Sequence, residues 1–313
     1  MFFQVFIPLK VESKNDVYLY VGGETVGLKI QSGLEVVSIY SVNGKSPAYD
    51  AGISESDQII SLNDVFVSSS KEFKNIINRS NGKSIKVDLK RNNVYMTVYL
   101  TPILIGNEYV CGIHLKEESL GIGTLTYVVP NTLEFGALGH NFISYIGETH
   151  GTLNQVKLTN IKKAKIGEAG EKQAEFSSNV LGEISINDSV GVFGKLYSNN
   201  VVEEKKLMKV GTQKSIKLGK AYIYSNMSKD TIGKYEIQIT EVNYQLTKGS
   251  QGIKFKVVDE ELLNISGGVV RGMSGSPIVQ NDQIIGAVSH VILKKPDEGY
   301  GMHIEFMLMN HYN

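Results

Sequence analysis

The apolar residues of this 313-residue chain come in short runs that are separated by glycine. Glycine occurs 32 times, the runs are rich in valine, isoleucine, threonine and tyrosine, and few of them keep the 3.6-residue spacing of a helix face. Short runs of β-branched and aromatic residues that end in glycine turns are typical of strands. The sequence therefore predicts a mainly β protein, and its length favours two domains over one.

Composition excludes several classes of function. Basic and acidic residues balance, 32 of each, so no overall field attracts nucleic acid, and we expect no nucleic-acid partner. The single cysteine, Cys111, cannot form a disulfide within the chain, and the six histidines are scattered. No cluster has the spacing of metal ligands, so we expect neither a metal nor another cofactor.

Residues 272–277, near the C-terminal end, read Gly-Met-Ser-Gly-Ser-Pro. A tight turn between glycines exposes a serine hydroxyl and directs backbone N–H groups at one point, as the nucleophile and oxyanion hole of a serine peptidase require. On this interpretation Ser274, rather than Ser276, attacks the substrate, and the N–H groups of Gly272 and Ser274 form the oxyanion hole. The alternative is a plain hairpin turn between two strands.

The residues that follow this turn read as strand, turn and strand. In peptidases of the trypsin and chymotrypsin fold, the nucleophile turn leads into a hairpin of this kind, and the second strand pairs with the substrate backbone. The segment resembles that arrangement in residue type and in length. On this resemblance Val288, Ser289 and His290 flank the bound peptide.

A general base must lie within hydrogen-bond reach of the serine, and His140 is the best candidate. It follows Phe-Gly-Ala-Leu-Gly, whose small residues let an imidazole lean into a cleft; without the serine motif it would be read as a polar cap. Two aspartates compete to orient the imidazole. Asp259 lies fifteen positions before Ser274, and Asp188 follows His140 at the interval of chymotrypsin-like chains. Spacing does not decide between them.

The first third of the chain has a different pattern. Ser69 and Glu72 have the spacing of a helix capping box, and Gly52 ends a short helix. The order of elements, with closing strands at 85–89 and 94–100, resembles a PDZ domain over residues 16–104. The resemblance implies a loop that captures the terminal carboxylate of a peptide, which then adds a strand to the sheet edge. That loop comprises Gly27, Leu28, Lys29 and Ile30. The alternative is a small β domain that only regulates its neighbour.

Three motifs follow the PDZ-like region in a specific order: Gly-Ile-Gly-Thr-Leu-Thr at 121–126, Gly-Ala-Leu-Gly-His at 136–140, and the turn at 272–277. With them, nearly the whole chain resembles the stage IV sporulation protein B peptidase family of spore-forming Firmicutes. The resemblance implies a chymotrypsin-like double β-barrel serine peptidase domain over residues 105–313. Residues 1–15 are then an N-terminal stub of uncertain role.

The same resemblance assigns the orienting carboxylate to Asp259, which gives His140, Asp259 and Ser274 as the catalytic residues, while barrel geometry keeps Asp188 as a rival. It further implies a signalling endopeptidase that is exported from the forespore to the space between the two sporulation membranes. Its expected substrates are the chain itself and a membrane-bound regulator of an intramembrane protease. We expect no signal or transmembrane segment in the chain as given. The alternative function is a catalytically silent PDZ-type binding or scaffold protein of the same pathway.

Overall fold

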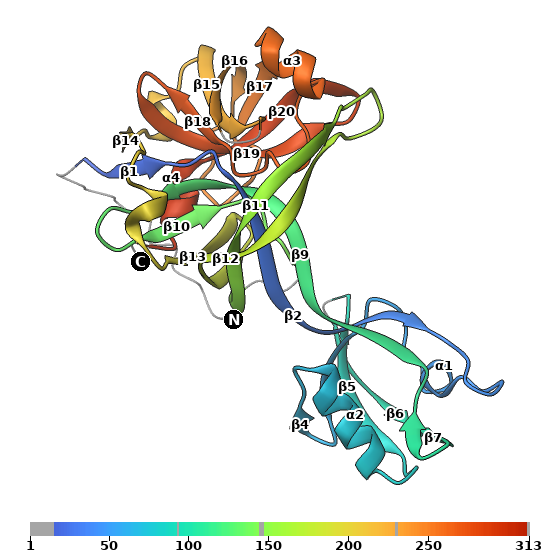
Figure 1. Cartoon of the computed structure of the whole chain (residues 1–313). Helices are drawn as coiled ribbons and strands as arrows, with labels where there is room; N and C mark the ends of the chain where they lie inside the picture. The colour runs from blue at the N-terminus through green and yellow to red at the C-terminus, as the bar shows by residue number, and fades with distance from the viewer. Residues whose placement is uncertain (1–15, 93, 144–146, 229–230, 312–313) are drawn as a thin grey trace, which may run out of the picture.

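The computed structural model describes residues 16–92, 94–143, 147–228 and 231–311. The protein is mainly β, as predicted, and consists of a larger and a smaller body (Figure 1). The expected stub at 1–15 lies outside the described residues. Within these ranges, no helix combines the length and the apolar character that crossing a membrane requires.

Six strands of the larger body pair, each antiparallel to the next, in a closed ring. Around the ring they are β2 (Thr25–Ile39), β9 (Ile113–Val128), β10 (Glu134–Ala137), β13 (Gly191–Leu196), β12 (Glu171–Asp188) and β11 (Gly147–Lys162), which pairs again with β2. Leu28, Phe135 and Val192 are among the residues that fill its interior. This first ring carries His140 just after β10.

A second closed ring follows in the sequence. It consists of β15 (Gly219–Asn226), β16 (Ile232–Val242), β17 (Ile253–Val257), β20 (Lys295–His303), β19 (Gln283–Ile292) and β18 (Pro277–Gln280), which pairs again with β15. Helix α3 (Glu260–Ser266) lies between β17 and the turn at 272–277. Two closed rings of this kind are what the predicted pair of β-barrels requires.

The two rings pack against each other through a shared apolar cluster. Tyr127 and Phe193 of the first ring and Val279 and Ile284 of the second belong to it. Strand β1 (Tyr18–Val21) pairs with β9 and with β14 (Leu207–Val210), which runs parallel to β19. The remaining elements of this body are η1 (Asn199–Val201), η2 (Gln213–Ser215) and α4 (Ile304–Leu308). The shared cluster and these strand pairings hold the two rings in a fixed relative position, as a site between them requires.

The smaller body has the predicted PDZ-like order of elements. These are α1 (Pro47–Asp50), β3 (Gln58–Leu62), β4 (Val65–Phe66), α2 (Ser70–Arg79), β5 (Ile85–Arg91), β6 (Val94–Leu100), β7 (Ile103–Ile105) and β8 (Glu108–Val110). Helix α2 begins where the Ser69 hydroxyl accepts a hydrogen bond from the Glu72 N–H at 3.2 Å. Phe73 and Ile77 of this helix are buried in the core.

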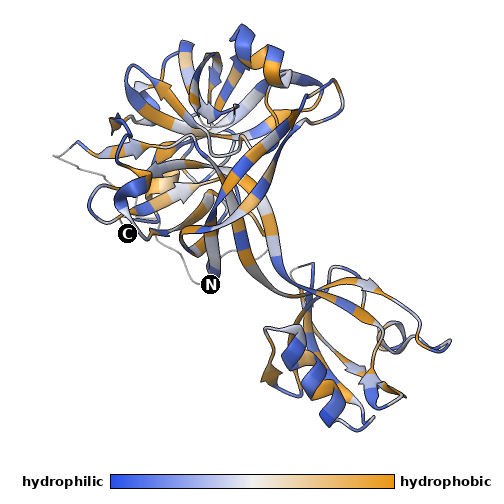
Figure 2. Cartoon of the chain, in the orientation of Figure 1, coloured by the Kyte–Doolittle hydropathy of each residue, from blue (hydrophilic) through white to orange (hydrophobic). Residues whose placement is uncertain are grey.

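Strands β2 and β9 run through both bodies and join them (Figure 1). Their pairing continues from Thr25 opposite Thr124 to Ile39 opposite Ile113. Up to Ile30, buried residues of β2 contribute to the core of the first ring, and from Leu34 onward to the core of the smaller body. Blue and orange alternate along many of the strands in Figure 2, as expected where one face of a strand is buried. The smaller body is therefore inserted between two strands of the larger one.

The predicted carboxylate-binding loop at Gly27, Leu28, Lys29 and Ile30 is wrong. These four residues lie within β2 and pair with β9 on one edge and with β11 on the other. Both edges of this strand segment are therefore occupied, and a peptide cannot add there as another strand. In the smaller body, by contrast, residues 113–116 of β9 pair with β2 on one edge, and no other described strand pairs with them.

Candidate active site

The turn that carries Ser274 needs glycine at two positions. Gly272 and Gly275 have φ angles of 89° and 91°, in the left-handed region that side chains disfavour. A Cβ atom on Gly275 would also lie 2.2 Å from the carbonyl oxygen of Thr124. Ser274 is half-buried, whereas Ser276 is fully buried. Of the two serines, only Ser274 has a hydroxyl that a substrate can approach.

Two peptide planes of this turn are fixed through their carbonyl groups. The Arg271 carbonyl accepts from the Lys172 N–H at 2.9 Å, and the Met273 carbonyl accepts from the Ser276 N–H, also at 2.9 Å. In a trans peptide the N–H points away from the C=O, so the N–H groups of Gly272 and Ser274 face the other way. Within the described residues, neither donates a hydrogen bond. Such unengaged N–H groups are what an oxyanion hole requires.

Two threonines of the first ring hold the turn in place. The Thr124 hydroxyl donates to the Gly272 carbonyl at 2.8 Å, and the Thr126 hydroxyl donates to the Gly275 carbonyl at 2.7 Å. The Thr124 N–H also donates to the Ser274 carbonyl at 2.9 Å. Both side chains are fully buried. The run at 121–126 thus anchors the nucleophile turn from the opposite ring, a role that sequence reasoning did not assign to it.

His140 comes to the same place from the end of β10. Leu138 and Gly139 both have left-handed backbone, with φ angles of 82° and 70°, and they redirect the chain after Ala137. A Cβ on Gly139 would lie 2.7 Å from the Val288 carbonyl oxygen, so this segment runs directly against β19. A left-handed leucine costs free energy, and such residues cluster at functional sites.

The electrostatic surroundings of His140 suit a general base. Its Nδ1 donates to the Asn141 carbonyl at 2.8 Å, which leaves Nε2 to accept a proton. Burial lowers the pKa of His140, and the hydrogen bond to Asn141 partly opposes that shift. The imidazole is therefore neutral at neutral pH. The Ser274 hydroxyl donates to the Ser289 carbonyl at 3.4 Å, a long hydrogen bond of the kind common in active sites without substrate.

The structure brings neither candidate carboxylate to His140. Asp259 is the N-cap of α3, where its two oxygens accept from the N–H groups of Leu262 at 3.0 Å and Glu236 at 3.1 Å. Asp188 ends β12 and is bound by Lys248, Asn310 and Ser189. In the described residues, the Asn141 carbonyl takes the position against His140 Nδ1 that sequence analysis assigned to Asp259.

The predicted substrate strand lies beside Ser274. The Gly275 N–H donates to the Val288 carbonyl at 2.8 Å, and the Val288 N–H donates to the Ser276 carbonyl at 2.9 Å. Ser289 is buried, and its hydroxyl lies within hydrogen-bond reach of the carbonyls of Ser250 and Tyr300. His290 is exposed and lies with its ring centroid 5.9 Å from that of His140. Burial and the neighbouring His140 lower the pKa of His290.

A comparison with known protein families identifies the family to which this chain belongs. The SpoIVB peptidase S55 family matches residues 107–308. The chain belongs to the SpoIVB peptidase family. A PDZ domain matches residues 10–101, whereas the core of the smaller body also draws on β9. A comparison with curated proteins gives no match. As a SpoIVB-family member the protein is a serine peptidase that hydrolyses peptide bonds, and the predicted enzyme class and domain types are confirmed.

One buried residue of this SpoIVB-family peptidase had no signal in the sequence. Lys172, on β12, lies directly behind the nucleophile turn, and its Nζ donates to the hydroxyls of Thr25 and Ser225, each at 3.0 Å. A lysine at the start of a strand, between Glu171 and Gln173, is ordinarily solvated. Only the pairing of distant segments places it inside.

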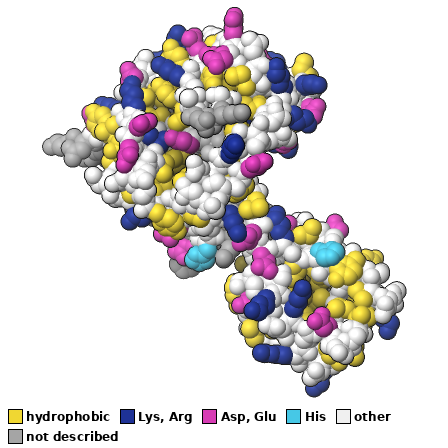
Figure 3. All heavy atoms as spheres, viewed as in Figure 1, with side chains coloured by type: hydrophobic (Ala, Val, Ile, Leu, Met, Phe, Trp, Pro, Cys, Tyr) yellow, Lys and Arg dark blue, Asp and Glu magenta, His cyan; other side chains and the backbone are white. Residues whose placement is uncertain are grey.

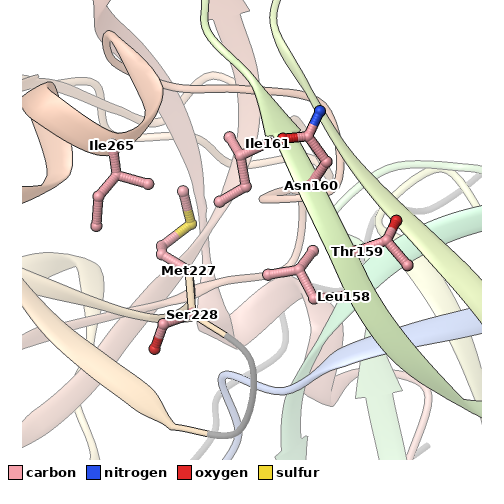
Figure 4. A pocket seen from close by; sticks show the side chains of 7 residues that line it. All are labelled: Leu158, Thr159, Asn160, Ile161, Met227, Ser228 and Ile265. Atoms are coloured by element: carbon pink, nitrogen blue, oxygen red, sulfur yellow. The ribbon is translucent and has the colours of Figure 1, made fainter.

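One pocket of the larger body is separate from this site. It measures about 280 Å³, and no candidate catalytic residue lines it. The side chains in Figure 4 line it: Leu158, Thr159, Asn160, Ile161, Met227, Ser228 and Ile265. Basic and acidic side chains are interspersed over the face that Figure 3 shows. Among the described residues, no three His, Cys, Asp or Glu side chains are grouped so that they could bind a metal ion.

Proposed function

We propose that this SpoIVB-family peptidase is an endopeptidase in which Ser274 is the nucleophile and His140 the general base. The observation that carries the proposal is the half-buried Ser274 in a turn where, among the described residues, the N–H groups of Gly272 and Ser274 donate no hydrogen bond. The segment that ends in His140 runs against the strand beside this turn. A closed hairpin turn would use those N–H groups itself.

The chemistry follows from these groups. Ser274 Oγ bonds to the substrate carbonyl carbon as His140 Nε2 accepts the hydroxyl proton, and the N–H groups of Gly272 and Ser274 hold the oxyanion. The C–N bond then breaks, His140 gives the proton to the leaving amine, and water releases the acyl group by the same steps in reverse. The Ser274 hydroxyl must first rotate away from the Ser289 carbonyl. The Asn141 carbonyl, rather than Asp259, orients His140 throughout.

For the biological role we propose that the enzyme cleaves itself and a membrane-bound regulator of an intramembrane protease, after export from the forespore. Family membership and the accompanying PDZ domain support a protein substrate. The smaller body offers a peptide the edge of β9 beside α2 that no described strand occupies, where the Ser70 N–H donates to Glu117 at 2.6 Å. A PDZ-type peptide would add there and not at Gly27.

A second candidate is a catalytically silent scaffold protein, and one observation favours it. The Ser274 hydroxyl donates to the Ser289 carbonyl, and no hydrogen bond joins it to His140 in the described residues. If that geometry persisted with substrate present, Ser274 would not be deprotonated. Under the first candidate the Ser274 hydroxyl leaves the Ser289 carbonyl by rotation about its side-chain bond, which is fast and inexpensive.

Covalent labelling by a fluorophosphonate probe separates the two candidates. We expect the folded wild type to be labelled and Ser274→Ala to remain unlabelled, because the probe reports the nucleophilic hydroxyl. Ser228→Ala, which changes an exposed serine of the same body, is the matched control and should label normally. Absence of label on the folded wild type, or equal labelling of Ser274→Ala, contradicts the proposal and favours the silent scaffold.

A further inference from the structure

Lys172 is a buried lysine that faces hydroxyl groups instead of carboxylates. It is 4% exposed, and its Nζ makes hydrogen bonds to Thr25 Oγ1 and Ser225 Oγ. Among the described residues no Asp or Glu forms an ion pair with it. Burial alone lowers the pKa of Lys172 to about 7. A lysine that is buried without an acidic partner calls for an explanation, because burial of its charge costs free energy.

The surroundings of Nζ match an uncharged amine. β2 contributes the Thr25 hydroxyl, β15 contributes the Ser225 hydroxyl, and the residue opposite on β11 is the apolar Ile161. None of these groups titrates near neutral pH. A neutral amine has two N–H donors for these two acceptors, whereas an ammonium group has a third donor that would stay unpaired.

Lys172 also contacts the nucleophile turn. Its own N–H donates to the Arg271 carbonyl at 2.9 Å. Its side-chain stem lies behind Gly272, where an added Cβ would be 3.0 Å from Lys172 Cβ and 3.2 Å from Cδ. The Arg271–Gly272 peptide is the one whose N–H belongs to the candidate oxyanion hole.

A chain of hydroxyl groups reaches the turn a second time. Ser225 accepts from the Ser276 hydroxyl at 3.0 Å, and Ser276 contacts the Thr124 hydroxyl at 3.4 Å. Thr124 in turn donates to the Gly272 carbonyl. Lys172 therefore supports both carbonyls that flank the Gly272 N–H, one through its backbone and one through this chain.

We infer that uncharged Lys172 is a positioning residue, which holds the Arg271–Gly272 peptide so that the Gly272 N–H faces the oxyanion. The inference rests on the proposed function of Ser274. Lys172 touches no substrate and acts through the turn. Without its anchor, the start of β12 can shift and the peptide plane can rotate, which removes one oxyanion donor. Loss of one such donor costs about 10²-fold to 10³-fold in rate.

The test compares labelling rates of the full chain with a fluorophosphonate. Lys172→Met keeps the length of the apolar stem but removes the amine, and we expect labelling about 10²-fold slower in folded protein. Lys205→Met is the matched control, since Lys205 is also buried in this body but pairs with Glu24, away from the turn. Its labelling rate should stay within about twofold of the wild type, because it makes no contact with the oxyanion donors.

The pH profile separates positioning from a merely structural role. In the wild type two groups must be neutral, His140 and Lys172, so the labelling rate should fall with a slope of two on the acid side. In Lys172→Met the slope should be one. If Lys172→Met does not fold, Thr25→Val, which keeps the lysine but removes an acceptor, carries the test and should label several-fold more slowly.

The outcomes distinguish this inference from the function on which it rests. Labelling of Lys172→Met at the wild-type rate with an unchanged pH profile overturns the role of Lys172, and Ser274 remains the nucleophile. Equal loss in Lys205→Met also overturns it, because the effect would then belong to any buried lysine of this body. A folded wild type that takes no label overturns both proposals.

Discussion

Each body contains a buried ionisable side chain, Asp57 in the smaller and Lys172 in the larger, and the two have opposite surroundings. In the smaller body, fully buried Asp57 accepts from Arg91 at 2.7 and 2.6 Å and from the Ser54 N–H at 2.8 Å. In the larger body, the Lys172 Nζ has only hydroxyl partners among the described residues. A buried charge that is paired helps to specify a single conformation, whereas a buried base without a charged partner lowers the free energy of unfolding. The difference indicates where to look for function, namely at a buried ionisable residue whose desolvation is not offset by a partner of opposite charge.

The largest expected effect is the pH-dependent stability that Lys172 produces. Its pKa is about 7 when folded and 10.5 in the reference state, so between these values the unfolded chain binds a proton that the folded chain does not. The free energy of unfolding should therefore rise with pH in this window, by up to about 1.4 kcal/mol per pH unit, and this contribution should be flat below pH 7. Denaturant unfolding of wild type and Lys172→Met at pH 7, 8, 9 and 10 measures it.

The contrast between Asp57 and Lys172 is contradicted if the difference in unfolding free energy between the wild type and Lys172→Met does not change with pH. Lys172 would then carry its charge in the folded state, and the two bodies would differ in partners but not in protonation. Lys205→Met is measured in parallel between pH 7 and 8, because burial lowers the pKa of Lys205 to about 8 and its own slope begins only near that pH. In this range Lys205→Met should keep most of the wild-type slope.

The next effect in size concerns the paired charge. Arg91→Met leaves the Asp57 carboxylate buried without its cation, and we expect a loss of about 3 kcal/mol in the stability of the smaller body, because an uncompensated buried charge is costly. Arg91→Lys, which keeps the charge but not the two-pronged contact, should lose about 1 kcal/mol. Thermal unfolding measures both changes, and fluorophosphonate labelling of Ser274 should be unaffected. A loss for Arg91→Met no larger than that for Arg91→Lys would mean that the pair contributes little.

The smallest effect is expected at Asp259. Asparagine is as good an N-cap as aspartate, so Asp259→Asn should lose only the acceptor for one N–H, about 1 kcal/mol of stability. Labelling should stay within about threefold of the wild type, because the carboxylate does not contact His140. If Asp259 orients the imidazole instead, the rate should fall by about 10⁴-fold. Asp188→Asn, measured beside it, serves as the control carboxylate.

Local patterns predicted much of the fold. The cap at Ser69, the apolar face of α2 and the strands β5 and β6 depend on residues close in sequence, and all of them are present. The role of Gly27 to Ile30 depends on β11, more than a hundred residues later, and so was misassigned. A strand pattern shows which residues alternate, but it does not show which distant strand occupies each edge.

The candidate site divides in the same way. The turn at 272–277 and the small residues before His140 carry their own conformational requirements, so the sequence was sufficient to find them. For Asp259 a local signal was available, because an aspartate followed by Glu-Glu-Leu is an N-cap pattern, but the assignment followed the family resemblance instead. Lys172 had no such signal, because its burial results from the meeting of β2, β12 and β15.

The continuous strands β2 and β9 have a consequence for how the molecule can be taken apart. Ile30 lies opposite Ser119 on neighbouring antiparallel strands, so the chain leaves the catalytic body and re-enters it at adjacent points. Residues 31–118 can therefore be removed as one unit. A two-residue reverse turn in their place would join β2 and β9 as an ordinary hairpin and leave the strand order of the first ring unchanged. Deletion of every residue up to 104 would instead remove β1 and β2, and with them part of the larger body that carries Ser274.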